Sequence, residues 1–135
     1  MWADDAALDA AGRRLDEWES SLVERAARAA RAKTLSARMQ ELTGTAHNND
    51  RTVEVTVECS GLLIGLRLDE RIRQQPAART AQQILETTRA ARTDLLRQVR
   101  ELTVEFLGDD ASGQAIIESY RSRLAGDQGS SDADR

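Results

Sequence analysis

The sequence predicts an α+β fold in which a long helix, an antiparallel β-hairpin, a second long helix and a small C-terminal helix follow one another. Three patterns predict it. Apolar residues recur at heptad spacing over residues 5–32, apolar and polar residues alternate over 52–58, and helical spacing returns over 77–107. Because 135 residues is an ordinary size for one domain, we expect a single folded body with extensions.

The first helix resembles a coiled-coil seam. Its heptad positions are occupied by Leu8, Leu15, Leu22 and Ala29, with Ala11, Trp18 and Ala32 at the intervening positions. Arg25 interrupts this seam. The spacing predicts a helix that packs against a partner helix, and residues 1–34 are interpreted as an N-terminal coiled-coil-like extension.

Further along the same helix the apolar face changes. Leu35, Met39 and Leu42 lie on a different face from the heptad leucines, because successive residues turn by about 100°. We expect this second part to bury against the sheet. Gly44 is interpreted as the helix stop, and the polar residues 45–50 as a loop.

The hairpin follows at residues 52–68. Val53, Val55 and Val57 share one face of the first strand, and Cys59, Ser60 and Gly61 form the turn. The return strand is expected to continue the buried face through Leu62, Ile64, Leu66 and Leu68, with Leu63 and Gly65 on the opposite face. Since two strands alone are only marginally stable in water, we expect helices on one side and a second chain at the strand edge. The predicted dimer-interface residues are Val53, Val55, Val57, Leu63, Gly65 and Leu66.

The remaining elements complete the expected layout. Asp69 can cap a short helical turn, Pro76 opens the long helix, and Ser112 can cap the small helix. The predicted segments are a core at 35–107, a short helix at 108–125, and an acidic, disordered tail at 126–135.

Nothing in the sequence predicts an enzyme or a cofactor site. His47 and Cys59 are the only residues of their kinds, so they cannot form a structural zinc set, and an exposed histidine and a turn cysteine are the simpler interpretation. No segment approaches the roughly 18 consecutive apolar residues of a membrane span. We therefore expect a cytoplasmic protein without a membrane partner.

Charge is unevenly distributed along the chain. The net charge is −4, which argues at first against nucleic acid. Residues 1–24 carry seven acids and two arginines, whereas residues 25–51 carry six bases and two acids. Arg25, Arg28 and Arg31 follow at a spacing of three and form one stripe, with Arg38 in the same arc. Such a stripe is either an ordinary solvated face or a surface that holds phosphates without reading bases. The candidate DNA-binding residues are Arg25, Arg28, Arg31, Lys33, Arg38 and Arg51.

The run TVEVTVECSGLLIGLRLD, preceded by ARMQELTG and followed by ILETTRAARTDLL, resembles the YbaB/EbfC family of nucleoid-associated proteins over roughly Leu35 to Phe106. The matching positions are Val53, Val55, Thr56, Val57, Gly61, Leu68 and Asp69. The resemblance implies a homodimer in which two hairpins build one shared sheet and the long helices project like tweezers. It also implies nucleoid-associated binding to double-stranded DNA with little sequence preference, by proteins that can be acidic overall.

Two functional hypotheses follow. The first is a homodimeric DNA-binding protein that alters DNA conformation and so affects gene expression. The second is a protein-protein interaction module or accessory protein of a specialised secretion system, because actinobacterial proteins that resemble this type also occur beside such systems. Its anchors would be Trp2, Trp18, Ile117 and Tyr120.

Overall fold

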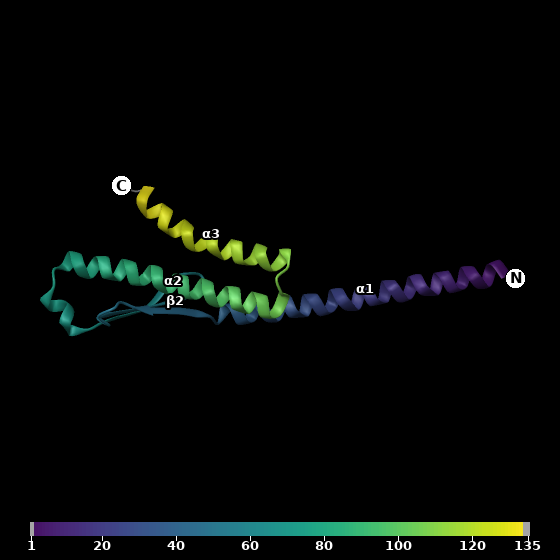
Figure 1. The fold of residues 1–135 in the computed structure, drawn as a ribbon, viewed down its shortest axis with the longest axis horizontal. Coiled ribbons are helices and arrows are strands. Elements are labelled where there is room, and N and C mark those ends of the chain that lie inside the picture. Colours follow the sequence, from purple (N-terminus) through teal and green to yellow (C-terminus); the bar gives the residue numbers. More distant parts are fainter. Residues whose placement is uncertain (1, 134–135) are drawn as a thin grey trace. The chain divides into compact units, whose positions relative to one another are not determined.

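The computed structural model describes the backbone of residues 2–133 and the side chains of residues 4–125. Its elements are α1 (Trp2–Gln40), β1 (Thr43–His47), β2 (Val53–Glu58), β3 (Leu63–Leu68), the 3-10 helix η1 (Glu70–Gln74), α2 (Ala77–Leu107) and α3 (Ala111–Ala133). The predicted α+β class and the order of helices are confirmed (Figure 1). The chain forms two compact units, Met1–Thr34 and Leu35–Arg135.

The sheet has three antiparallel strands in the order β1-β2-β3, rather than the two of a hairpin. The predicted loop at residues 45–50 is therefore wrong over its first part, since Thr43–His47 pair with Glu54–Glu58. Gly44 lies inside β1 and does not end the helix. A Cβ atom at Gly44 would stand 2.2 Å from the Ala91 carbonyl oxygen, so glycine is needed there because α2 crosses the strand closely.

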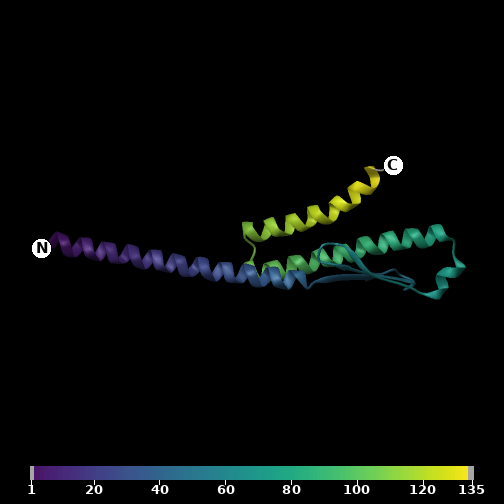
Figure 2. The ribbon, with the colours of Figure 1, turned by 180° about the vertical axis from the view of Figure 1, so that it is seen from behind.

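The core lies between α2 and the sheet (Figure 2). Val53, Val55 and Val57 are fully buried, as the strict alternation predicts. The helix contributes a row at spacings of four, namely Thr87, Ala91, Leu95, Val99 and Thr103. Leu35 and Met39 of α1 join this cluster, which confirms that the second part of the first helix buries against it.

The return strand β3 differs from the prediction. Leu62, Ile64, Leu66 and Leu68 are 63%, 54%, 42% and 42% exposed and are not buried as expected. Leu66 and Leu68 pair with Val55 and Val53 and share their face, but α2 packs mainly against β1 and β2 and leaves β3 uncovered. Beyond Leu66 an irregularity between Thr56 and Val57 also shifts the pairing, so that Val57 lies opposite Leu63.

The two ends of α2 are set by their flanking residues. Asp69 caps η1 as predicted, because its carboxylate accepts the Arg71 N–H at 2.9 Å, and Pro76 precedes α2. Gly108 ends α2 with a φ of 72°, in the left-handed region that favours glycine.

The small helix α3 packs back on α2. Its cap is Asp110, whose carboxylate accepts the Gly113 N–H at 2.9 Å, and not the predicted Ser112. Ile117 and Leu124 are buried. The backbone of this helix extends to Ala133, beyond the predicted end at 125. The predicted disorder of the tail falls on residues 126–135, which lie outside the part whose side chains are described.

Candidate nucleic-acid interface

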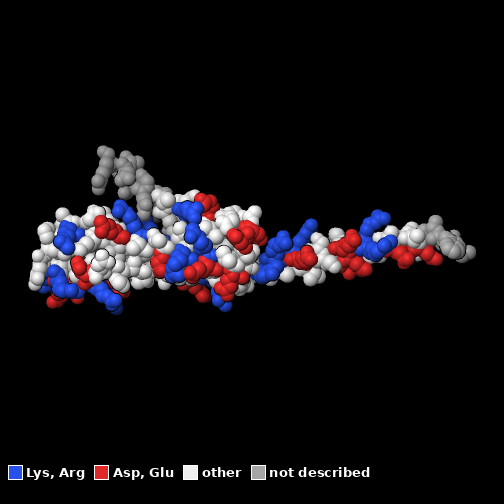
Figure 3. Space-filling view, in the orientation of Figure 1, with Lys and Arg blue, Asp and Glu red and all other residues white. Residues whose placement is uncertain are grey.

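The basic block of α1 is solvent-exposed. The side chains of Arg25, Arg28, Arg31 and Lys33 are all exposed, and no acidic residue occurs between Arg25 and Arg38. Figure 3 shows basic and acidic side chains gathered in alternating blocks along this helix. Arg25, Arg28 and Arg31 of the predicted stripe thus form an exposed surface of the unit Met1–Thr34.

The other two predicted DNA contacts belong to the second unit. The Arg38 guanidinium lies over the Phe106 ring, 5.7 Å from its centroid. This contact orients the guanidinium plane and still leaves its edge open. Arg51 occupies the turn between β1 and β2 with a φ of 57°, and its backbone N–H donates to the Asn48 carbonyl at 3.1 Å. Arg51 therefore has a part in the turn besides any contact with DNA.

A second basic surface is formed by residues that the sequence analysis missed. Arg89 and Arg92 of α2 and Arg121 of α3 line a hollow of about 180 Å³, together with Thr93. Arg92 donates to the Gly61 carbonyl at 3.4 Å, and Arg121 pairs with Glu118 at 2.8 Å. Helical spacing brings Arg89 and Arg92 together, but only the folding of α3 onto α2 adds Arg121.

One edge of the sheet is closed by polar side chains of α2. Asp94 accepts the Thr45 N–H at 3.2 Å, and Gln98 donates to the Thr43 carbonyl at 2.8 Å, so two of the outward backbone groups of β1 have partners on α2. Partial burial raises the pKa of Asp94, but hydrogen bonds from Arg97, from the Thr45 N–H and from Gln98 outweigh it and hold the pKa below its ordinary value. The charged form of Asp94 therefore secures this edge.

The opposite edge, along β3, is available. The Asp69 N–H donates to the Thr52 carbonyl, and by the alternation of an antiparallel ladder the N–H and C=O groups of Leu66 and Leu68 point away from β2. Exposed apolar side chains accompany these backbone groups: Leu63, Ile64, Leu66 and Leu68. An uncapped strand edge with apolar side chains is suited to pairing with another chain.

The six predicted interface residues divide between core and edge. Val53, Val55 and Val57 are buried under α2 of their own chain, so they support the sheet from within instead of meeting another subunit. Leu63 and Leu66 lie on the exposed strand, and Gly65 pairs with Thr56 between them. Of the six predicted interface residues, only Leu63, Gly65 and Leu66 of β3 therefore lie on the exposed edge strand.

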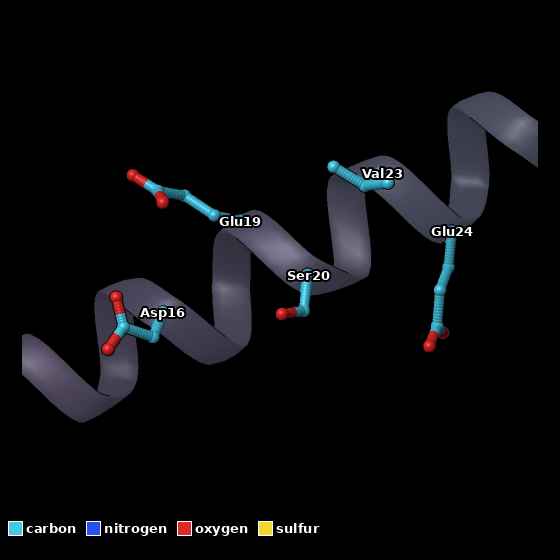
Figure 4. Close-up of a pocket in the computed structure, with 5 residues that line it drawn as sticks. All are labelled: Asp16, Glu19, Ser20, Val23 and Glu24. Atoms are coloured by element: carbon cyan, nitrogen blue, oxygen red, sulfur yellow. The ribbon is translucent and has the colours of Figure 1, made fainter.

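The surface hollows of α1 are each lined by residues of that one helix. One is lined by Asp16, Glu19, Ser20, Val23 and Glu24, all from one helix, and their side chains fan out from its surface (Figure 4). Over the part of the chain that the structure describes, no three histidine, cysteine, aspartate or glutamate side chains gather as a metal site would require. Within the same part, no helix is long and apolar enough to cross a membrane.

The residues proposed as anchors for a protein partner differ in their exposure to solvent. Trp18 is 61% exposed, whereas Ile117 is buried and Tyr120 packs against the core. The side chain of Trp2 lies outside the described residues. Free apolar surface on the helices is therefore concentrated on α1, where Leu8, Leu15 and Val23 are exposed beside Trp18.

Comparison with known proteins agrees with this architecture. The chain matches the sequence model of the YbaB/EbfC DNA-binding family over residues 19–109, which is more than half of its length. The match includes the basic block of α1, the sheet and all of α2. No curated protein and no solved structure matched the chain. From the extent of the family match, the chain belongs to the YbaB/EbfC DNA-binding family.

Proposed function

We propose that this chain is a non-enzymatic, nucleoid-associated protein that binds double-stranded DNA as a homodimer with little sequence preference. The observation that carries the proposal is the basic block of α1. It has five exposed bases and no acid from Arg25 to Arg38, inside the region that matches the DNA-binding family. A chain with a net charge of −4 thus concentrates positive charge on one stretch of one helix.

The chemistry of this block suits phosphate and not base edges. Each guanidinium presents a planar fork of N–H donors that matches two phosphate oxygens. The residues between the bases are mostly alanines, which are small enough for a DNA backbone to approach the helix. Arg25, Arg28, Arg31 and Arg38 are the main phosphate contacts in this proposal, with Lys33 and Arg51 as weaker ones. Such contacts hold DNA without reading its sequence.

Dimerisation follows from the asymmetry of the sheet. Asp94 and Gln98 occupy the outer edge of β1, so the exposed edge of β3 is where a second sheet can add. Pairing there would cover part of Leu63, Leu66 and Leu68 and would join the sheets of the two subunits into one continuous sheet. A dimer presents two basic blocks, and it can therefore bridge or bend DNA and affect gene expression.

Charge reversal tests this proposal. The triple variant Arg25→Glu, Arg28→Glu, Arg31→Glu is expected to lose the mobility shift of random duplex DNA. The variant Arg13→Glu is the matched control, because Arg13 is an exposed arginine of the same helix that lies in the acidic block. The control should bind nearly as well as the parent chain. Equal binding by all three proteins would overturn the assignment of DNA contacts to α1.

A second candidate function is a protein-protein interaction module, such as an accessory protein of a specialised secretion system, without DNA binding. It is favoured by the exposed apolar side chains of α1, Leu8, Leu15, Trp18, Leu22 and Val23. Recovery of bound proteins from a native lysate separates the candidates. A partner that stays bound after nuclease treatment and is lost with Trp18→Ala would support the second candidate, provided that the chain binds no DNA.

A further inference from the structure

Helix α1 carries a row of large apolar side chains that nothing covers within the described part of its unit. Leu15, Trp18 and Leu22 are 58%, 61% and 41% exposed, and they lie at heptad spacing on one stripe. The stripe continues toward the C-terminal side through Arg25, Ala29 and Ala32. We call these six residues the α1 seam. Its first two members, Leu15 and Trp18, precede the part of the chain that matches the family.

We propose that the α1 seam is covered by the same seam of a second copy of this chain, running in the antiparallel direction. The seam is bulky at one end, with Leu15 and Trp18, and small at the other, with Ala29 and Ala32. Antiparallel pairing sets bulky against small in the outer layers, which is how facing core positions fill space. Leu15 then meets Ala32 of the second copy, and Trp18 meets its Ala29.

The central layer of the antiparallel pair can accommodate Arg25, the one charged residue of the seam. In the same register Leu22 meets Arg25 of the second copy. The aliphatic stem of an arginine can cover a leucine while its guanidinium reaches water at the rim. A parallel pair would instead bring Arg25 against Arg25 and Ala29 against Ala29, which combines like-charge repulsion with an unfilled layer. Arg25 thus disfavours the parallel arrangement.

Charges beside the seam select the same direction and register. On one flank Glu19 and Lys33 of the second copy, which both occupy the position next to the seam, face each other with opposite charge. Two-fold symmetry makes this pair occur twice. Shifting the register by one heptad, so that Leu8 meets Ala32, would place the acidic stretch Asp16–Glu24 against itself. Complementary charge therefore fixes a register that sequence spacing alone leaves open.

This contact is separate from the β3 edge, and it leaves Arg31 open to DNA. Arg31 lies on the side of the helix away from the seam, because it is about 140° from Trp18 around the helix axis at roughly 100° per residue. Lys33 has three N–H donors, so a carboxylate partner leaves donors for a phosphate. If the homodimer proposed above also forms, α1 pairing gives its two chains a second contact or joins one dimer to another.

The mass of the full-length chain in solution, measured without DNA over a concentration series, tests the pairing. Leu22→Glu is expected to abolish the association of two chains through α1, and so to lower the mass measured in solution. Val23→Glu is the matched control, because Val23 is 68% exposed, adjacent in sequence and outside the seam. The control should keep the parent mass. If Leu22→Glu also keeps the parent mass, or if both variants lose the same association, the seam is not the contact.

Charge exchange tests direction and register. Glu19→Lys and Lys33→Glu are each expected to weaken this association roughly tenfold, since each turns two attractions into repulsions. The double variant should recover most of the loss, because the pair is restored with reversed polarity. A double variant as weak as either single variant would contradict the antiparallel register. Arg31→Glu should weaken DNA binding without changing the mass, so the failure of either proposal is recognised separately.

Discussion

The Asp94 carboxylate of α2 accepts the backbone N–H of Thr45 at 3.2 Å, and this contact gives the sheet one closed edge and one open edge. The carboxylate also accepts bonds from Arg97 at 2.8 Å and Gln98 at 2.9 Å. A single helix thereby packs on the sheet and bonds to the outward Thr45 N–H and Thr43 carbonyl of β1. The strand left for another chain is β3, whose apolar side chains are exposed.

Removing this carboxylate should weaken the folded state. Asp94→Ala leaves the outer Thr45 N–H without its partner and is expected to lower the free energy of unfolding by about 1 to 2 kcal/mol. Urea unfolding followed by circular dichroism measures the change. Glu105→Ala, an exposed acid on the same helix, is the control and should differ little from the parent chain. Equal stability of all three proteins would mean that the Asp94 contact contributes nothing.

The same residue predicts a dependence on pH. Because the pKa of Asp94 is lower in the folded chain, its charged form stabilises the fold above the unfolded pKa, near 4. That contribution is lost as the pH falls through the folded pKa. Asp94→Asn lacks this titration, so its unfolding free energy should fall less steeply than that of the parent chain below about pH 4. Parallel pH profiles for the two proteins would contradict this assignment.

Two glycines should respond oppositely to alanine. Gly44→Ala puts a Cβ atom 2.2 Å from the Ala91 carbonyl oxygen and 2.8 Å from the Leu95 Cβ, so α2 must move and the fold should lose about 1 to 3 kcal/mol. Gly12→Ala meets no atom within 4 Å and lies in α1, where alanine favours the helix by up to about 1 kcal/mol. Thermal unfolding curves should therefore shift down for the first and not for the second. A harmless Gly44→Ala would disprove the close crossing.

The open sheet edge predicts where a charge breaks the proposed subunit contact. Leu66→Lys places an ammonium on the exposed strand and should reduce association through β3, as measured by the mass in solution. Val104→Lys changes an equally exposed apolar residue, 44% exposed, on α2 and serves as the control. Its mass should match that of the parent chain. An unchanged mass for Leu66→Lys would place the contact elsewhere.

Local periodicity was enough to predict most of the fold. The alternation around Val55 identified a buried strand face, and the helical spacing before and after the sheet identified α1 and α2, because both patterns arise from neighbouring residues. Gly44 was misread because a glycine after a helix fits a helix stop as well as a strand that another helix crosses. The choice depends on Ala91 and Leu95, nearly fifty residues away.

The exposed return strand could not be predicted for a related reason. Leu66 and Leu68 share the face of Val55 and Val53, but α2 packs mainly against β1 and β2, and alternation in a single strand does not reveal which strands the helix covers. The hollow between α2 and α3 was also missed, since Arg89 and Arg121 meet only after two helices pack. The basic block of α1, by contrast, is contiguous in sequence, and the sequence sufficed to find it.

The most direct test of the central claim, that the basic block of α1 holds DNA through phosphates, is the affinity for random duplex DNA across a salt series. Four phosphates neutralised per chain predict that the logarithm of affinity falls with the logarithm of salt at a slope of about −3.6 per chain. Arg31→Glu should reduce the steepness by about one. Binding that is independent of salt, or a slope that Arg31→Glu leaves unchanged, would contradict the claim.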